Sequence, residues 1–309
     1  MKNIYSLLAV LLFMCMLLSP LLAREGIEKT EKKPPKTAEK DVFLVLCGDE
    51  IKTLTAEEYV CGVVSAEMPA LYENEALKAQ AVAAYTYAAR KREQRKEEDY
   101  HITSSSDTDQ AYIDKEQQKE KWGEKYEEYS EKIAKAVESG KGQKLTYDGE
   151  LCMSVYHAIS AGKTEKASVV WGEDFAYLQS VESIGDLLSP DYKSEVLLSP
   201  EELSEKLKDK ITPTGEPSSW FGECQKSEIG SVQKISVCGS EISGSELREK
   251  LGLRSTNFSV EFVDNKFKIT VLGYGHGVGM SQYGANCMAQ QGSDYKEILA
   301  WYYKGSKLE

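Results

Sequence analysis

Glycine occupies every second position from residue 273 to residue 279, a pattern that strongly restricts how this stretch can fold. Glycine weakens helices and strands by roughly 0.5–1 kcal/mol relative to alanine, so four alternating glycines do not serve stability. They suit backbone that approaches another group closely or adopts a positive φ. Because polar side chains accompany them, the pattern favours a ligand-facing surface, and the alternative is a bulged strand packed against its own neighbour. The polar residues are His276, Ser281, Gln282 and Tyr283.

The first 23 residues indicate the cellular location of the rest of the chain. Residues 4–23 are uncharged and mostly apolar, and about twenty such residues can cross a bilayer as a helix. The stretch before Arg24 lacks the small residue that signal peptidase requires two positions before the cut. Residues 1–23 are therefore expected to be a retained, single-pass transmembrane helix rather than a cleaved signal. Residues 24–40, rich in Lys, Glu and Pro, predict a disordered stalk that carries an extracytoplasmic domain on the cell membrane.

The composition argues against several kinds of partner. The net charge of −12 disfavours nucleic acid and anionic lipid. The cysteine spacing matches no small disulfide framework, although Cys224 and Cys238 could bridge a loop. The chain has 3 histidines and neither a His-Glu-x-x-His motif nor paired Cys-x-x-Cys motifs, so no metal and no other cofactor is expected.

The order of predicted elements indicates an α+β fold, with mixed helices and antiparallel strands around a cleft. Thr55 and Glu58 form a capping box that begins a helix, and Pro69 requires that helix to end by residue 68. An alanine-rich helix at about 75–96 is expected to be central, because its small residues point in all directions. Further strands are expected at 42–47, 144–147, 150–156, 231–238, 258–263 and 267–272, and further helices at 115–139, 200–209, 245–251, 280–291 and 294–304.

Glu67 is the carboxyl best suited to acid catalysis. It is expected in the last turn of its helix, where the helix macrodipole disfavours a negative charge. Val63, Val64 and Met68 provide apolar surroundings, and both effects raise the pKa of a carboxyl group. A glutamic acid that stays protonated near neutral pH can act as the general acid in glycoside cleavage. The alternative is an ordinary surface glutamate at a helix end.

Two histidines stand where a base, an orienting group or a sugar donor could be needed. His157 follows a predicted strand and precedes Ser160, while His276 lies among the glycines. Each could equally be structural. Cys152 and His157 could form a thiol hydrolase, but nothing around Cys152 resembles a thiolate activated at a helix N-terminus.

Several motifs follow one another between residues 41 and 305. They are Glu67-Met68-Pro69, Ala79-Gln80-Ala81-Val82-Ala83-Ala84, Gln110-Ala111-Tyr112, His157 to Gly162, Val170-Trp171-Gly172, Leu251-Gly252-Leu253-Arg254-Ser255 and Gly273 to Ala285. In this order they resemble the stage II sporulation protein D family, which acts on peptidoglycan during endospore formation. The helix end at Glu67 and the glycine-histidine segment are the most specific of these motifs.

The resemblance implies a peptidoglycan lytic transglycosylase (a lyase). It would cleave glycan strands already stripped of stem peptides, between N-acetylmuramic acid and N-acetylglucosamine, and leave 1,6-anhydro ends. It implies septal cell wall degradation and engulfment, in the septal membrane of the sporulating cell. The implied partners are glycan strands, a sporulation amidase or endopeptidase and a membrane protein. The catalytic domain would span 41–305, with a possible variable insertion at about 184–230.

The resemblance also assigns the catalytic residue, and the residues of this sequence suggest the glycan-binding side chains. The catalytic acid and base would be Glu67. The side chains expected to bind the glycan are Tyr85, His157, Ser160, His276, Ser281, Gln282 and Tyr283.

Three differences from the family pattern bear on this assignment. Tyr85 stands where the family usually has arginine, so a cation near the acid is missing, which favours protonated Glu67 but weakens glycan binding. The segment 157–162 carries fewer hydroxyl groups than usual. Some relatives carry Cys and His just before the Gln-x-Tyr motif, whereas 106–109 reads Ser-Asp-Thr-Asp, so a zinc site is not expected.

Two other functions remain open. The missing arginine keeps a non-catalytic wall-glycan module that recruits an amidase in consideration. An amidase or peptidase would require a metal or an activated thiol, which the sequence does not reveal.

Overall fold

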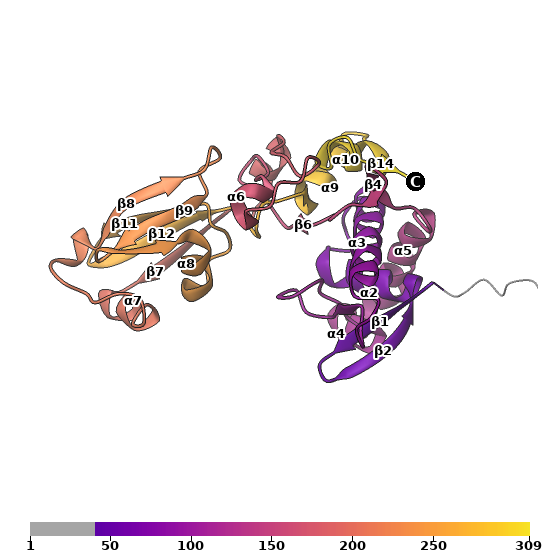
Figure 1. Cartoon of the computed structure of the whole chain (residues 1–309), viewed down its shortest axis with the longest axis horizontal. Coiled ribbons are helices and arrows are strands. Elements are labelled where there is room, and N and C mark those ends of the chain that lie inside the picture. The colour runs from indigo at the N-terminus through magenta and orange to yellow at the C-terminus, as the bar shows by residue number, and fades with distance from the viewer. Residues whose placement is uncertain (1–40) are drawn as a thin grey trace, which may run out of the picture. The chain divides into compact units, whose positions relative to one another are not determined.

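The computed structural model describes residues 41–309 (Figure 1). The expected anchor at 1–23 and stalk at 24–40 lie outside the described residues. Among residues 41–309, no helix is both long and apolar enough to cross a bilayer. The described part has the predicted α+β fold, and most of its strand pairs are antiparallel.

The first elements place Glu67 at a helix end. Strands β1 (Val42–Cys47) and β2 (Glu50–Thr55) form a hairpin, of which the sequence predicts only the first strand. Helix α2 (Ala56–Glu67) begins with the predicted capping box, in which Thr55 Oγ accepts a hydrogen bond from Glu58 N. The helix ends at Glu67 because Met68 is extended, as the following proline requires. Strand β3 (Ile102–Thr103) adds to β1 in parallel.

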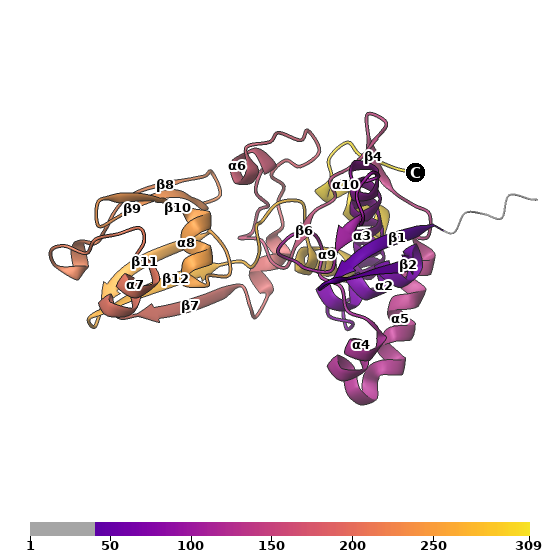
Figure 2. The same ribbon diagram turned by 60° about the horizontal axis from the view of Figure 1, so that its bottom comes forward.

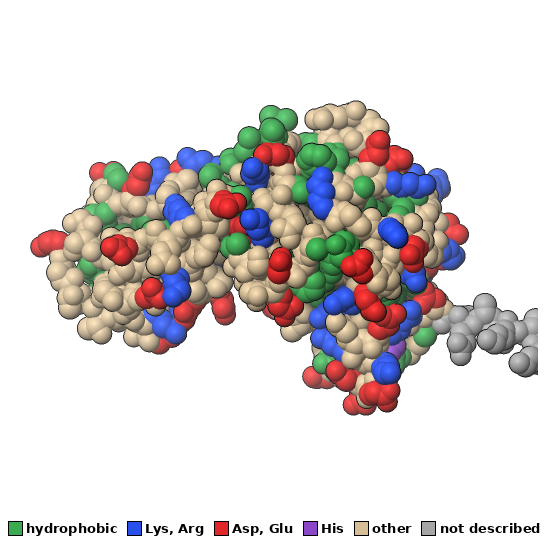
Figure 3. Space-filling model, turned by 45° about the horizontal axis from the view of Figure 1, so that its top comes forward, with side chains coloured by type: hydrophobic (Ala, Val, Ile, Leu, Met, Phe, Trp, Pro, Cys, Tyr) green, Lys and Arg blue, Asp and Glu red, His purple; other side chains and the backbone are tan. Residues whose placement is uncertain are grey.

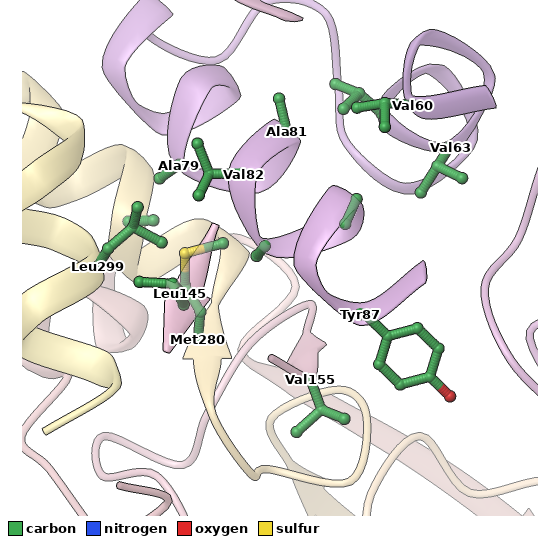
Figure 4. Close-up of a cluster of buried hydrophobic side chains, with 14 of the residues drawn as sticks. Val60, Val63, Ala79, Ala81, Val82, Tyr87, Leu145, Val155, Met280 and Leu299 are labelled. Carbon is green, nitrogen blue, oxygen red and sulfur yellow. The ribbon is translucent and has the colours of Figure 1, made fainter. Parts of the chain in front are cut away.

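Helix α3 is central, as its alanine content predicts. Its small side chains let other helices approach closely, and it packs against four of them. Figure 4 shows Val82 of this helix beside Leu145, Met280 and Leu299, which come from three later elements. The helices are α3 (Asn74–Gln94), with α2, α5 (Tyr126–Ser139), α9 (Gln282–Gln290) and α10 (Tyr295–Tyr302) around it.

The single helix predicted at 115–139 is wrong. It is divided into α4 (Lys115–Trp122) and α5 by the short 3-10 turn η1 (Gly123–Lys125). Gly123 adopts φ +53°, which glycine tolerates and which ends α4. Asp114 caps α4 by accepting a hydrogen bond from Gln117 N. Lys121 of α4 contacts the C-terminal end of α2.

Two short strands connect the middle of the chain to the glycine-rich segment. Strands β4 (Leu145–Tyr147) and β5 (Glu150–Leu151) form the predicted hairpin, and β14 (Lys307–Leu308) pairs with β4. Strand β6 (Tyr156–His157) then pairs in parallel with β13 (Met280–Ser281). His157 is thereby fixed beside the residues that follow the glycines.

Residues 193–272 build a second hydrophobic core that includes Phe267 and Ile269. It contains two three-stranded sheets, with orders β10-β9-β8 and β11-β12-β7 (Figure 2). The region expected as a variable insertion, 184–230, supplies β7 and β8 to these sheets. The elements are β7 (Lys193–Leu198), α7 (Pro200–Lys206), η3 (Pro217–Ser219), β8 (Phe221–Lys226), β9 (Val232–Val237), β10 (Ser240–Ser243), α8 (Gly244–Leu251), β11 (Phe258–Val263) and β12 (Lys266–Leu272).

The possible bridge between Cys224 and Cys238 is not formed, and both are free thiols. Cys224 lies in β8 opposite Ile235, whereas Cys238 occupies the turn after β9 with φ +50°. The strand register therefore holds the two sulfur atoms at different levels of the sheet.

The alternating glycines approach the protein's own backbone. All four have positive φ, between 73° and 110°. A Cβ atom at Gly273 would lie 2.8 Å from the carbonyl oxygen of Ile159, and one at Gly279 would lie 2.1 Å from that of Val155. Gly273 and Gly279 are therefore packed against backbone, whereas Gly275 lines the cleft described below. The segment is not the bulged strand of the alternative either, because no strand lies between β12 and β13.

Candidate active site

One cleft of about 770 Å³ collects half of the predicted site residues. Glu67, His157, His276 and Gln282 all line it. Its other walls come from the loop at 106–111, from α6 (Ala167–Trp171) and from α8. Residues that are distant in the sequence thus meet around Glu67.

Glu67 is half-buried in this cleft at the C-terminal end of α2. Its Oε1 accepts a hydrogen bond from Ala111 N at 3.0 Å, and the Gln282 side chain is a second partner. Burial raises the pKa of the Glu67 carboxyl above its ordinary value, although these hydrogen bonds and the charge of Lys121 oppose the rise. No Lys or Arg among residues 41–309 forms an ion pair with it within 4.0 Å.

Lys121 of α4 places a cation near Glu67, which the sequence did not predict. Its Nζ donates hydrogen bonds to the carbonyl oxygens of Ser65 (2.7 Å) and Ala66 (3.2 Å). These carbonyl groups belong to the last turn of α2, where no intrahelical donor exists, so Lys121 stabilises the helix end. Its charge also lowers the pKa of Glu67. The sequence alone predicts no cation there, because Tyr85 replaces the family arginine.

Neutral polar side chains form the inner wall of the site. Gln110 Oε1 accepts a hydrogen bond from the Tyr156 hydroxyl at 2.7 Å, and Gln110 Nε2 donates to the Tyr59 hydroxyl at 3.1 Å. Burial raises the pKa of both phenols well above the ordinary value, so both stay neutral. Glu67 therefore faces dipoles rather than fixed charges on this side.

His157 presents a hydrogen-bond acceptor. Its Nδ1 lies 3.0 Å from the carbonyl oxygen of Val278, which can only accept, so Nδ1 carries the proton. Nε2 is then an acceptor, and it has no partner within the described part of the chain. Burial, reinforced by His276, lowers the pKa of His157 to about 3. His157 is thus a neutral acceptor and cannot serve as the sugar donor that the sequence left open.

His276 is neutral as well. Its Nδ1 accepts a hydrogen bond from Val278 N at 3.1 Å. Burial, and then the charge of Arg248, lower its pKa to about 4. The rings of His157 and His276 lie 5.8 Å apart, centroid to centroid. The segment between Gly275 and Gly277 therefore places the His276 ring in the cleft wall.

Ser160 and Ser281, predicted to bind the glycan, do not line the cleft. Both residues are buried, with exposed fractions of 2% and 0%. Their hydroxyl groups donate to the carboxylate of Asp186, Ser281 at 2.7 Å. Burial raises the pKa of Asp186, and these hydrogen bonds counteract that effect. The two serines satisfy a buried carboxylate, so their role is structural.

Tyr85 and Tyr283 lie away from the cleft lining. The Tyr85 ring packs against Phe43, with centroids 6.1 Å apart. The Tyr283 hydroxyl donates to the carbonyl oxygen of Leu188 at 3.3 Å, and its ring contacts Tyr72. Glycan binding by these two residues at this cleft does not fit their positions.

The structure adds residues that the sequence did not single out. Trp171 and Tyr274 line the cleft with 39% and 46% of their surface exposed. Exposed aromatic rings in a cleft provide apolar faces for a ligand. Trp171 lies 5.1 Å from His276, ring centroid to ring centroid. Arg248 reaches the same cleft from the second core.

Residues 41–309 present neither a candidate metal site nor an activated thiol at Cys152. Residues 41–309 contain no group of three or more His, Cys, Asp or Glu side chains arranged to hold a metal ion. Burial raises the pKa of the Cys152 thiol to about 12, the reverse of what an activated nucleophile needs.

The comparison with known proteins identifies the family. The profile of the family described as "Stage II sporulation protein" matches residues 48–147. Stage II sporulation protein D of Bacillus subtilis (strain 168) is 35% identical over 261 residues, which cover 84% of this chain and 75% of that protein. This chain belongs to the stage II sporulation protein D family.

Two further relatives extend the comparison. Stage II sporulation protein D of Bacillus amyloliquefaciens is 35% identical over 285 residues, covering 91% of this chain and 81% of the relative. An amidase enhancer of Bacillus subtilis (strain 168) is 29% identical over 307 residues, covering 80% of this chain and 40% of that protein. The predicted family is therefore confirmed, and Glu67 falls within the stretch that matches the stage II sporulation protein profile.

Proposed function

We propose that this sporulation protein is a lytic transglycosylase that cleaves peptide-free peptidoglycan strands. The observation that carries the proposal is Glu67, a half-buried carboxyl with a raised pKa in a cleft lined by aromatic rings and neutral histidines. A carboxyl in this environment keeps its proton at higher pH than an exposed one, which suits a general acid.

In the proposed reaction Glu67 performs both proton transfers. Its protonated carboxyl donates to the glycosidic oxygen between N-acetylmuramic acid and N-acetylglucosamine, and C1 of the muramic ring gains oxocarbenium character as the bond breaks. The Glu67 carboxylate then accepts the proton of the muramic C6 hydroxyl. O6 bonds to C1, which closes the 1,6-anhydro ring and returns the proton to Glu67. No water is consumed.

Two aspartates also line the cleft: Asp107 is exposed on the loop, and Asp109 is bound by cations. The Asp109 side chain is fully buried and pairs with Lys91 at 3.1 Å and Arg95 at 2.8 Å. Burial alone would raise its pKa, but hydrogen bonds from Arg95 and Thr103 N hold the pKa below its ordinary value. A carboxylate held in this way cannot attack a sugar. A substrate that supplies its own nucleophile needs no second carboxyl.

The pH profile tests the role assigned to the Glu67 proton. Only the acid form can start the reaction, so kcat/KM falls as pH rises through the pKa of Glu67. Lys121→Met removes a charge that lowers this pKa. The alkaline limb of the profile is therefore expected to move to higher pH, whereas Lys121→Arg and the exposed Lys119→Met should leave it in place. An unchanged limb, or one moved to lower pH, contradicts the assignment.

The products provide the direct test. Full-length protein is incubated with peptide-free glycan strands, and the ends are analysed by mass spectrometry. Transglycosylation yields 1,6-anhydro ends that are lighter by one water than hydrolytic ends. Reducing ends that take up oxygen from labelled water would instead identify a hydrolase.

A glycan-binding module that recruits an amidase is the second candidate. The name of one relative, amidase enhancer, favours it. We propose that a partner amidase acts with this protein at the extracytoplasmic face of the membrane. If enhancement is independent of cleavage, Glu67→Gln protein stimulates that amidase on intact cell wall as well as the parent does. Loss of stimulation in this variant would tie enhancement to glycan cleavage.

A further inference from the structure

Arg248 is a cation of the cleft without an ionic partner. It lies in α8 and lines the cleft with its side chain half-buried. Within residues 41–309, no carboxylate lies within 4.0 Å of its guanidinium group, which also makes no hydrogen bond. Arginine stays protonated in proteins, so the charge persists despite the lost hydration. A ligand carboxylate would compensate this cost with two parallel hydrogen bonds.

The other charged side chains of the cleft differ in this respect. Lys91 is paired with the buried Asp109. Arg254 lies near the cleft, with its guanidinium carbon 5.2 Å from the Tyr274 ring centroid. Its Nη1 donates a hydrogen bond to Asp191 Oδ1 at 3.0 Å. Among the described residues that line the cleft, Arg248 is thus the cation still available to an anion. Over the face shown in Figure 3, acidic and basic side chains are intermingled and form no broad basic surface.

The residues around Arg248 indicate which kind of anion would bind there. The charge of Arg248 lowers the pKa of His276, and the same guanidinium interacts with Tyr274. The Trp171 ring lies 5.1 Å from the His276 ring, centroid to centroid. The anion-binding group therefore lies among exposed rings that suit the apolar face of a sugar. A carboxylate attached directly to a sugar ring matches this combination.

We propose that Arg248 binds the lactyl carboxylate of a muramic acid residue and so makes the cleft selective for peptide-free strands. The inference rests on the proposed function and deepens it. In intact peptidoglycan the lactyl carboxyl group is part of an amide bond to the stem peptide. Removing the peptide releases a carboxylate on the muramic ring, which is the anionic group of a bare strand. The protein's net charge of −12 repels such a strand at long range, so recognition depends on a local cation.

Binding measurements isolate this contact from catalysis. Glu67→Gln protein, which cannot consume the strand, is titrated with peptide-free glycan and with the same glycan after its lactyl carboxyl groups are converted to methylamides. The free carboxylate is expected to bind about 10- to 100-fold more tightly, the range of a charge-assisted hydrogen-bond pair. Adding Arg248→Met should remove this preference and leave the affinity for the methylamide unchanged, which also shows that the cleft is intact.

Two controls sharpen the result. Arg254→Met removes a neighbouring guanidinium that is already paired, and it should retain the full preference. Strands that still carry stem peptides also contain carboxylates, but not on the lactyl group. They should bind like the methylamide, and binding as tight as that of the bare strand would assign the anion to the peptide and overturn the proposal.

The outcomes separate this inference from the proposed reaction. Equal affinity for the free acid and the methylamide overturns the role of Arg248, as does a preference that survives Arg248→Met. If the parent protein forms anhydro ends equally fast from both polymers, the reaction stands and the inference fails. A carboxylate preference without any turnover leaves Arg248 in place and refutes the transglycosylase. Binding to neither polymer refutes both.

Discussion

Glu67→Gln is expected to reduce the formation of 1,6-anhydro ends by about 10²- to 10⁴-fold, the usual contribution of a general acid and base. The amide has the size of the carboxyl group and can still accept the hydrogen bond from Ala111 N. It can neither release a proton to the glycosidic oxygen nor take one from the C6 hydroxyl. Because both transfers are assigned to this single group, no other side chain of the cleft replaces it.

The measurement pairs initial rates with glycan affinity and thermal stability. Affinity and Tm should stay close to those of the parent, because the substitution preserves shape and removes no ion pair within residues 41–309. Glu120→Gln on α4 is the matched control, since it removes one carboxylate from an exposed position. Parental activity in Glu67→Gln would exclude Glu67 as the catalytic group and favour the binding-module function.

Local signals in the sequence are sufficient to place Glu67. The capping box at Thr55 and the proline at 69 act within one helical turn, so they determine the bounds of α2 without tertiary contacts. The central position of α3 and the hairpin of β11 and β12 follow for similar reasons, from small side chains and from a two-residue turn. The acid at a helix end is therefore predictable from residues that are its neighbours along the chain.

The rest of the site depends on contacts between distant elements. Lys121 reaches the end of α2 from α4, and Arg248 reaches the cleft from a separate core. Ser160 and Ser281 look like sugar ligands in the sequence, but Asp186 lies buried between them. Composition and spacing do not reveal which polar groups a buried carboxylate will recruit.

The alternating glycines show the same limit. Their pattern correctly predicts positive φ and close approach, yet it does not name the group approached. For Gly273 and Gly279 that group is the backbone at 155–161, and His276 is carried between Gly275 and Gly277 into the cleft wall. The close contacts of Gly273 and Gly279 thus help to hold the segment that carries His276 in the cleft wall.

Gly279→Ala is expected to destabilise the protein by about 3–5 kcal/mol, which places it among the most disruptive single substitutions. An alanine at φ +73° costs roughly 1–2 kcal/mol in backbone strain. Its Cβ would also lie 2.1 Å from the carbonyl oxygen and 3.0 Å from the carbonyl carbon of Val155, both of them backbone atoms. Relief requires moving β6, which carries His157, away from β13.

Gly48→Ala distinguishes steric overlap from backbone strain. Gly48 has a similar φ of +62°, but a Cβ atom there would meet nothing within 4 Å, so only the strain of roughly 1–2 kcal/mol is expected. Urea unfolding of the full-length variants compares the two. If both lose the same stability, the backbone at Val155 yields easily and close packing does not explain the glycine. If Gly279→Ala instead keeps its stability and loses glycan affinity, the glycines face the ligand after all, because a Cβ atom that does not disturb the fold can act only on what enters the cleft.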